Sequence, residues 1–283
     1  SRGHRPSPTF STCTPEASAG FEPANGPRTS QYSTDQSNVM ENSDKTREPP
    51  AGVVNLYKPV GRSSAQYVYR LRRVFGIRKV GHAGTLDPFA DGVLLACVGK
   101  ATKLVERLMG LPKRYRTTLR LGVTNATFDS DHPFEPHPDP RKPESGDIQS
   151  FLDSLVGVTE QTPPAFSAIK LGGVPSYKLA RKGREVTLAA RPVRIDEARL
   201  LAFEWPSATI EILCGRGTYI RSIARDLGEA MACGACCETL TRLSVGPFDI
   251  DSAARLDVPE ADVANSLLSI PTVLDRIAPF ERS

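Results

Sequence analysis

The side chain best placed to do chemistry in this chain is the carboxylate of Asp87. It lies within residues 81–103, GHAGTLDPFADGVLLACVGKATK, where glycines and Pro88 indicate a tight loop. The apolar run 93–98 that follows has the length of a buried strand. A carboxylate held in a tight loop can act as a nucleophile or a base, so Asp87 is the first catalytic candidate. The alternative is that Asp87 only caps a turn before Pro88.

The segments on either side of this loop predict the elements that hold it. Residues 52–59 predict a short strand ended by a proline. Ser63 or Ser64 can then cap a helix whose apolar residues recur at helical spacing. Residues 101–109 predict a second short helix after the strand.

Residues 113–121, KRYRTTLRL, alternate with the two-residue period of a strand. Tyr115 falls on the face shared with Leu119 and Leu121, which suits either core packing or a stacking surface. Further along, a glycine turn with Thr218 as the predicted N-cap leads into a helix whose first turns carry Tyr219 and Arg221.

The rest of the chain mixes helices and strands without a regular strand–helix–strand repeat. We expect helices over 148–155 and 260–275, and strands over 193–203, 208–214 and 239–248. This order favours an α+β fold over a doubly wound sheet.

The first 50 residues differ in composition from the rest. They contain 29 Ser, Thr, Pro, Gly, Asn and Gln residues. The few apolar side chains that remain cannot bury enough surface to offset the entropy cost of ordering this segment. We therefore expect a disordered tail over 1–50 and one catalytic domain over 51–283. No run approaches the roughly 18 apolar residues that a membrane span needs, so we expect no membrane partner.

The positive charge is concentrated in one part of the chain. Residues 51–121 hold 14 Lys and Arg against 3 Asp and Glu, whereas residues 122–283 hold 17 against 23. Such asymmetry is typical of a face that binds a polyanion, although a solvated basic surface gives the same count. Residues 160–187 form a further basic segment with proline and glycine hinges, suited to contact a phosphate backbone.

Six cysteines are present, several of them in apolar runs where a free Cys behaves as a small buried hydrophobe. This usage indicates a reducing, cytoplasmic setting. Cys233, Cys236 and Cys237 resemble half of a zinc site, but the chain offers no second pair at a suitable spacing, so we expect no metal.

Seven blocks of the sequence, taken in their order along the chain, resemble the bacterial branch of the TruB family of tRNA pseudouridine synthases. They are GVVNLYKPVGRSS, GHAGTLDPFADGVL, GKATK, KRYR, TPPAFSAIKLGGVPSYKLARKG, RGTYIRSIARDLG and LTRLSVGPF. The resemblance covers residues 52 to about 275. It implies a pseudouridine synthase fold, with a mixed, mainly antiparallel curved sheet flanked by helices and a central cleft.

The same resemblance implies conversion of uridine 55 in the tRNA T-loop to pseudouridine without a cofactor, by a protein that we expect to be a monomer. Carried onto matching positions, Asp87 is the catalytic aspartate and Arg221 pairs with it. Tyr115 and Tyr219 border the flipped base. His82 fills the space that the base leaves, and Leu240 closes the pocket.

These residue types suit that chemistry. A guanidinium beside Asp87 favours the ionised carboxylate and can bind it at two points. Extruding the base costs a few kcal/mol, and stacking on an aromatic ring such as Tyr115 returns roughly 1 to 3 kcal/mol. The carboxylate could attack the sugar, attack the base or remove a sugar proton, and the sequence does not choose among these routes.

Each assignment has a purely structural alternative. His82 could be a satisfied structural histidine, Tyr219 and Leu240 could be ordinary core, and Arg221 could form a surface ion pair. Lys58 and the basic cluster that includes Lys170 are expected to contact phosphate, but could form only a solvated basic face.

Two departures from the family pattern bear on activity. Relatives often carry an acid where this chain has Ala126, so a polar contact near the active site could be lost. The family usually continues into a small C-terminal RNA-binding domain, and we expect that domain to be absent here. These departures motivate a second hypothesis, an RNA-binding or RNA-folding module with weak catalysis. A third is a pseudouridine synthase with another RNA target.

Overall fold

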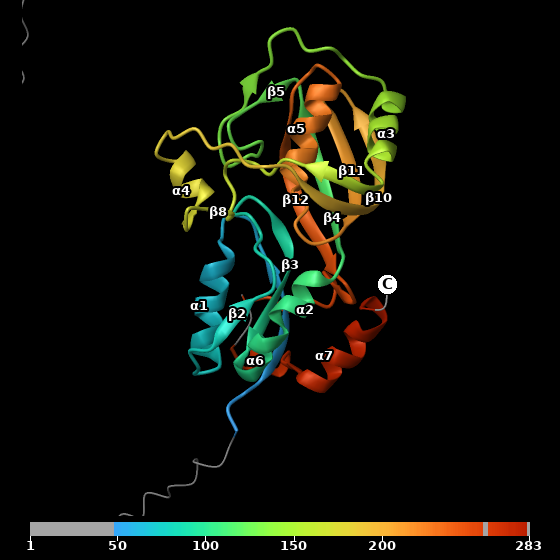
Figure 1. The fold of residues 1–283 in the computed structure, drawn as a ribbon. Coiled ribbons are helices and arrows are strands. Elements are labelled where there is room, and N and C mark those ends of the chain that lie inside the picture. Colours follow the sequence, from blue (N-terminus) through green and yellow to red (C-terminus); the bar gives the residue numbers. More distant parts are fainter. Residues whose placement is uncertain (1–47, 257–259, 282–283) are drawn as a thin grey trace, which may run out of the picture. The chain divides into compact units, whose positions relative to one another are not determined.

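A computed structural model describes residues 48–256 and 260–281. The predicted disordered tail therefore lies, except for its last three residues, outside the described residues. The part from Glu48 onward forms one compact unit, which is the unit considered below (Figure 1).

One large sheet organises the fold, as predicted. Within the described residues its strand order is β14-β1-β3-β12-β4-β11-β10-β7, with β2 added to β3 and β13 added to β12. Its strands are β1 (Gly52–Lys58), β2 (Val80–His82), β3 (Asp91–Val98), β4 (Lys113–Leu121), β7 (Gly157–Gln161), β10 (Arg191–Glu204), β11 (Ser207–Cys214), β12 (Ala235–Val245), β13 (Phe248–Asp249) and β14 (Leu268–Ser269). Two short hairpins stand apart from it, β5 (Val123–Thr124) with β6 (Glu135–Pro136), and β8 (Lys170–Leu171) with β9 (Val174–Pro175).

The pairings between the named strands are antiparallel except for one parallel seam between β3 and β12, and two isolated bridges outside them are also parallel. The seam spans two residue pairs, Thr241 with Asp91 and Arg242 with Gly92. Gly92 is required there, because its φ is +106° and a Cβ would lie 2.2 Å from the carbonyl oxygen of Arg242. The seam joins a half containing β14, β1 and β3 to a half containing β12, β4, β11, β10 and β7.

Helices cover the sheet (Figure 1). They are α1 (Ser64–Val74), α2 (Val105–Gly110), α3 (Ser145–Ser154), α4 (Ser176–Ala180), α5 (Ile220–Ala230), α6 (Glu260–Asn265) and α7 (Ile270–Ile277), with 3₁₀ turns at Gly99–Leu104 and Ala278–Phe280. Ser63 caps α1, as predicted, and Gln66 completes a reciprocal capping box.

Three predicted elements need correction. The N-cap of α5 is Tyr219 rather than Thr218, whose hydroxyl instead donates to the Gly215 carbonyl. The terminal helix over 260–275 is two helices, because β14 intervenes and pairs with β1. The strand over 239–248 is also divided, since a turn separates β12 from β13.

The core lies on both faces of the sheet. Along β1, Val54 and Leu56 join a large cluster that also contains residues of α1, α3 and α5, whereas Val53 packs in a second cluster with residues of α2 and α7. Strands buried on both faces have continuous apolar sequences. This explains why the run after Asp87 shows no alternation.

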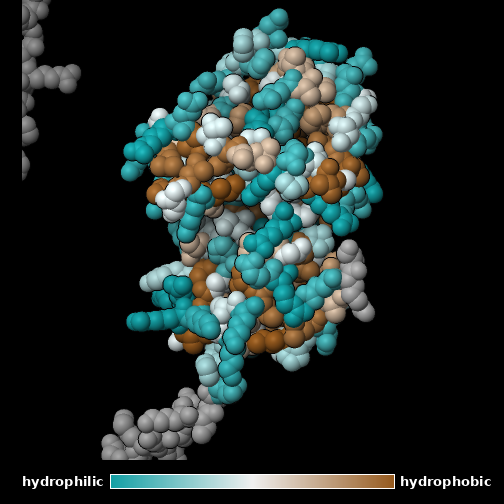
Figure 2. Space-filling view, viewed as in Figure 1, coloured by the Kyte–Doolittle hydropathy of each residue, from teal (hydrophilic) through white to brown (hydrophobic). Residues whose placement is uncertain are grey.

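Figure 2 shows hydrophilic side chains over much of the visible surface, with hydrophobic groups gathered in an upper and a lower part. No helix in the described part of the chain is long and apolar enough to cross a membrane. Across the described ranges, no three His, Cys, Asp or Glu side chains gather in a way that could hold a metal ion.

Candidate active site

The Asp87 loop, residues 83–90, connects β2 to β3 and is fastened to the start of α1. The Ser64 hydroxyl accepts a hydrogen bond from the Leu86 amide at 2.9 Å and donates to the Leu86 carbonyl at 3.2 Å. The Gly61 amide donates to the Pro88 carbonyl at 2.8 Å. These contacts bracket Asp87 on both sides and fix its backbone.

Arg242 on β12 holds the same loop from the other half of the sheet. Its side chain is 1% exposed, and its guanidinium donates to the carbonyls of Val93 at 2.7 Å, Gly84 at 3.2 Å and Thr85 at 3.4 Å. Buried arginine needs partners for its five N–H donors, and here backbone carbonyls supply them. Arg242 therefore ties the loop across the seam.

Arg221 at the start of α5 joins two carboxylates. Its Nε lies 3.0 Å from Oδ2 of Asp87 and its Nη1 lies 3.2 Å from Oδ2 of Asp129. The Asp87 contact is an ion pair without hydrogen-bond alignment, since Nε has no hydrogen-bond partner among the described residues. The Asp87 side chain is 35% exposed and those of Arg221 and Asp129 are 4% and 5% exposed. Only Asp87 of this group is open to a ligand.

Backbone carbonyls fix the remaining donors of Arg221. Nη1 donates to the Thr127 carbonyl at 3.1 Å and Nη2 to the Phe166 carbonyl at 3.0 Å. Phe166 belongs to the basic segment 160–187, and the Ser222 hydroxyl donates to the Thr162 carbonyl of the same segment at 2.8 Å. The first turn of α5 thus holds residues 162–166, near the start of this segment, next to the Arg221 that pairs with Asp87.

Burial shapes the electrostatics around this ion pair. Desolvation raises the pKa of Asp129, against the opposing effects of the Thr127 hydroxyl and of Arg221. Desolvation also raises the pKa of Tyr115, with a smaller contribution from the negative charge of Asp87. Tyr115 lies on β4, partly buried against the large core cluster.

The other predicted pocket residues lie in or near the core. His82 is on β2, its pKa is lowered by desolvation, and its Nδ1 is buried without a hydrogen-bond partner among the described residues. Leu240 is 6% exposed on β12, within the large core cluster. The ring of Tyr219 lies under the guanidinium of Arg191, 5.3 Å from its centroid. The roles predicted for these three residues at the base stay predictions.

Lys58 requires a correction, because it is fully buried and not on a basic surface. Its ammonium donates to the carbonyls of Arg62 at 2.7 Å, Pro59 at 2.9 Å and Pro88 at 3.4 Å. Desolvation lowers the pKa of Lys58 to about 8. It stabilises the Asp87 loop and does not reach a phosphate from this position. Lys170, in contrast, is exposed on β8.

Sequence reasoning missed three residues that position this site: Asp129, Arg242 and Gln161. Asp129 lies three residues after Ala126, where the loss of an acidic contact was expected. The structure leaves Ala126 exposed and brings the Asp129 carboxylate to Arg221. The polar turn around Asp129 and the arginine within LTRLSVGPF were available signals. Gln161, at the end of a short and mostly exposed strand, offered none.

Known proteins share the sequence that builds this site. The sequence model described as "TruB family pseudouridylate synthase (N terminal domain)" matches residues 72–220, which include Asp87, Tyr115 and Asp129. The chain belongs to the TruB family. Within this TruB chain the match ends one residue before Arg221, the partner of Asp87.

Curated relatives extend the TruB similarity over most of the chain. The protein named tRNA pseudouridine synthase B from Syntrophotalea carbinolica is 43% identical over 227 residues, covering 79% of this chain and 74% of that protein. The protein of the same name from Mycobacterium tuberculosis is 43% identical over 210 residues, covering 73% of this chain and 70% of its own.

Solved structures confirm the predicted fold. A chain in a Cbf5-Nop10-Gar1 complex superposes with a TM-score of 0.60 at 26% identity, over 80% of this TruB chain and 62% of that chain. A chain in an archaeal box H/ACA Nop10-Cbf5 complex gives 0.57 at 22% identity, over 80% and 61%, and shows the fold alone. The present chain spans less than two thirds of either one.

Proposed function

We propose that this protein is a tRNA pseudouridine synthase that isomerises uridine 55 in the T-loop. The observation that carries the proposal is the pairing of Asp87 with Arg221 at 3.0 Å in a chain of the TruB family. The loop around Asp87 is fixed from both halves of the sheet, while its carboxylate stays partly exposed. Relatives named tRNA pseudouridine synthase B support tRNA as the substrate.

The reaction needs only the groups that the site offers. The N1–C1′ bond of uridine breaks, the base turns, a C5–C1′ bond forms, and one hydrogen leaves C5 while one is gained at N1. No electron is transferred to another molecule, so the proposal includes no cofactor. The Asp87 carboxylate attacks the sugar, attacks the base or removes a sugar proton. Each of these three routes begins from the ionised carboxylate beside Arg221.

Exposed basic residues support an RNA substrate. The segment 160–187 presents Lys170 and its neighbouring Lys and Arg side chains to solvent. Near its start, the carbonyl of Phe166 accepts a hydrogen bond from Arg221. Phosphates of the T-arm held by this segment would lie next to the reacting base. The proposal further includes that the protein acts on tRNA as a monomer in the cytoplasm.

The test is release of tritium from a tRNA transcript carrying 5-tritiated uridine. Wild type is expected to release it, whereas Asp87→Asn and a transcript lacking the T-loop uridine are expected to give none. Asp275→Asn, which removes the same charge from an exposed position on α7, is the matched control and should retain full release.

Two results would contradict the proposal. Binding of tRNA without tritium release would indicate the RNA-folding module instead. Release from the transcript that lacks the T-loop uridine would mean that the enzyme acts on another position.

A further inference from the structure

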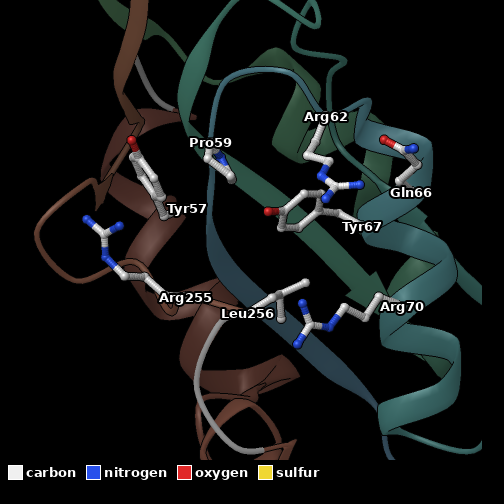
Figure 3. A pocket seen from close by; sticks show the side chains of 8 residues that line it. All are labelled: Tyr57, Pro59, Arg62, Gln66, Tyr67, Arg70, Arg255 and Leu256. Atoms are coloured by element: carbon white, nitrogen blue, oxygen red, sulfur yellow. The ribbon is translucent and has the colours of Figure 1, made fainter.

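A cavity of about 430 Å³ lies beside the Asp87 loop and is not used by the proposed reaction. Its walls come from the end of β1, the start of α1 and the residues Arg255 and Leu256. Figure 3 shows Tyr57 and Arg255 on one side of it and Arg62, Tyr67 and Arg70 on the other. This volume falls within the roughly 300 to 1,000 Å³ typical of ligand pockets.

The cavity is positively charged. Arg62, Arg70 and Arg255 are exposed to solvent, and no carboxylate in the described ranges lies within ion-pair distance of their guanidinium groups. Other arginines of the fold, such as Arg107, Arg114 and Arg216, do pair with acids. Arginines that line one cavity suit a phosphate, which accepts their planar donors.

An aromatic ring in a fixed position completes the cavity. The Tyr57 hydroxyl donates to Oδ2 of Asp91 at 2.6 Å, and the Arg255 guanidinium lies over the Tyr57 ring, 4.3 Å from its centroid. The Asp91 carboxylate thus holds the Tyr57 hydroxyl in place. The bond to Asp91 and burial together raise the pKa of Tyr57 to about 12, so the phenol stays neutral.

The segment between the lining residues Pro59 and Arg62 contacts the Asp87 loop. Tyr57 contacts Asp91, four residues after Asp87, and the neighbouring loop contacts Pro88 through the Gly61 amide and the Lys58 ammonium. A strand of RNA whose base is held at Asp87 can therefore continue across this loop. A cavity with arginines on its walls and a rigid ring next to such a strand suits a nucleotide.

We propose that this cavity binds a second, non-reacting nucleotide of the RNA substrate, with its phosphate against Arg62, Arg70 and Arg255 and its base beside Tyr57. This inference rests on the proposed function for the identity of the RNA. It gives the enzyme a contact that fixes the register of the RNA strand at Asp87.

The test compares tRNA affinity between Arg70→Gln and Arg73→Gln by fluorescence anisotropy. Both side chains are exposed on α1 and lose the same charge, but only Arg70 lines the cavity. Arg70→Gln is expected to weaken binding about fivefold or more and Arg73→Gln less than twofold. The triple variant of Arg62, Arg70 and Arg255 to Gln should lower the slope of log affinity against log salt by about 0.7 to 0.9, the value for one phosphate.

A second pair of variants tests the base. Tyr57→Ala removes the ring and should weaken tRNA binding by about tenfold. Tyr57→Phe keeps the ring and loses only the bond to Asp91, so it should cost much less. Thermal unfolding of each variant shows whether a loss of tRNA binding reflects misfolding of the protein and not the missing side chain.

The outcomes separate this inference from the proposed function. Binding is measured in the Asp87→Asn background, where no turnover occurs. Equal affinities for Arg70→Gln and Arg73→Gln overturn the inference even if wild type releases tritium. Calorimetric binding of uridine monophosphate that is lost in Arg70→Gln, with tRNA affinity unchanged, would assign the cavity to a free nucleotide. Wild type without tRNA affinity overturns both proposals.

Discussion

Gln161 at the end of β7 binds the backbone of Tyr219 at two points. Its Oε1 accepts from the Tyr219 amide at 2.8 Å and its Nε2 donates to the Tyr219 carbonyl at 3.1 Å. Tyr219 is the N-cap of α5 and has no capping side chain of its own. A residue 58 positions away therefore fixes the backbone at the start of the helix that carries Arg221.

Replacing Gln161 with Leu should lower both stability and activity. The Tyr219 amide would lose its acceptor, at a cost of about 1 to 3 kcal/mol in the free energy of unfolding. The start of α5 would loosen, so tritium release should slow more than tRNA binding weakens. Gln161→Glu keeps the acceptor and should recover part of the loss. Equal rates for Gln161→Leu and wild type would show that the contact between Gln161 and Tyr219 does not position Arg221.

Asp129→Asn should reduce catalysis while leaving the fold intact. The substitution keeps the shape of the side chain but removes one of the two negative charges beside Arg221. We expect a rate loss of about tenfold or more and a stability loss of about 1 to 3 kcal/mol. Asp131→Asn, an exposed acid in the same turn, is the control. Ala126→Asp should leave both quantities nearly unchanged, because position 126 is exposed.

Arg242→Met should destabilise the protein strongly. The change leaves the carbonyls of Gly84, Thr85 and Val93 without their shared donor in a buried place. The expected cost is about 3 kcal/mol or more, measured by urea unfolding. Arg276→Met on the exposed side of α7 is the control. A small loss for Arg242→Met would mean that water replaces the guanidinium.

Stability should fall as pH rises above about 9. Burial raises the pKa of Cys214 to about 11 and those of Cys97, Cys236 and Cys237 to about 12. In this range the unfolded thiols release protons that the folded thiols keep, so the unfolded state binds fewer protons and unfolding becomes easier. Each thiol contributes at most about 1.4 kcal/mol per pH unit.

Buried lysines act in the opposite direction but are fewer. Desolvation lowers the pKa values of Lys58 and Lys113 to about 8, so between about 8 and 10.5 the unfolded state binds more protons at these two groups. Urea unfolding at several alkaline pH values should show the net fall. Cys97→Ala should make the fall of stability with pH shallower by the contribution of one thiol. An unchanged pH dependence in that variant would show that the Cys97 thiol does not contribute to the fall.

Local patterns predicted the elements better than the contacts between them. The alternation in β4 and the caps of α1 are set by neighbours in sequence, and both were confirmed. The pairing of Asp87 with Arg221 came from the resemblance, not from spacing. Lys58 was misassigned because a lysine after an apolar strand carries no sign of the three carbonyls that surround it. Asp129 contacts Arg221 and Gln161 contacts Tyr219, and both partners lie 58 or more positions away in sequence. The spacing of residues within one helix or strand does not predict such contacts.

The parallel seam between β3 and β12 gives the reaction centre a mechanical sensitivity. Asp87 is carried by the half that contains β3, and Arg221 by α5, which packs on β12 and β4 of the other half. Two residue pairs form the strand pairing at the seam and Arg242 bonds across it, while the chain after β13 adds backbone hydrogen bonds to β1. Any bending along the seam changes the separation of the two charged partners. The ion pair between Asp87 and Arg221 therefore depends on how firmly the two halves of the sheet are held together.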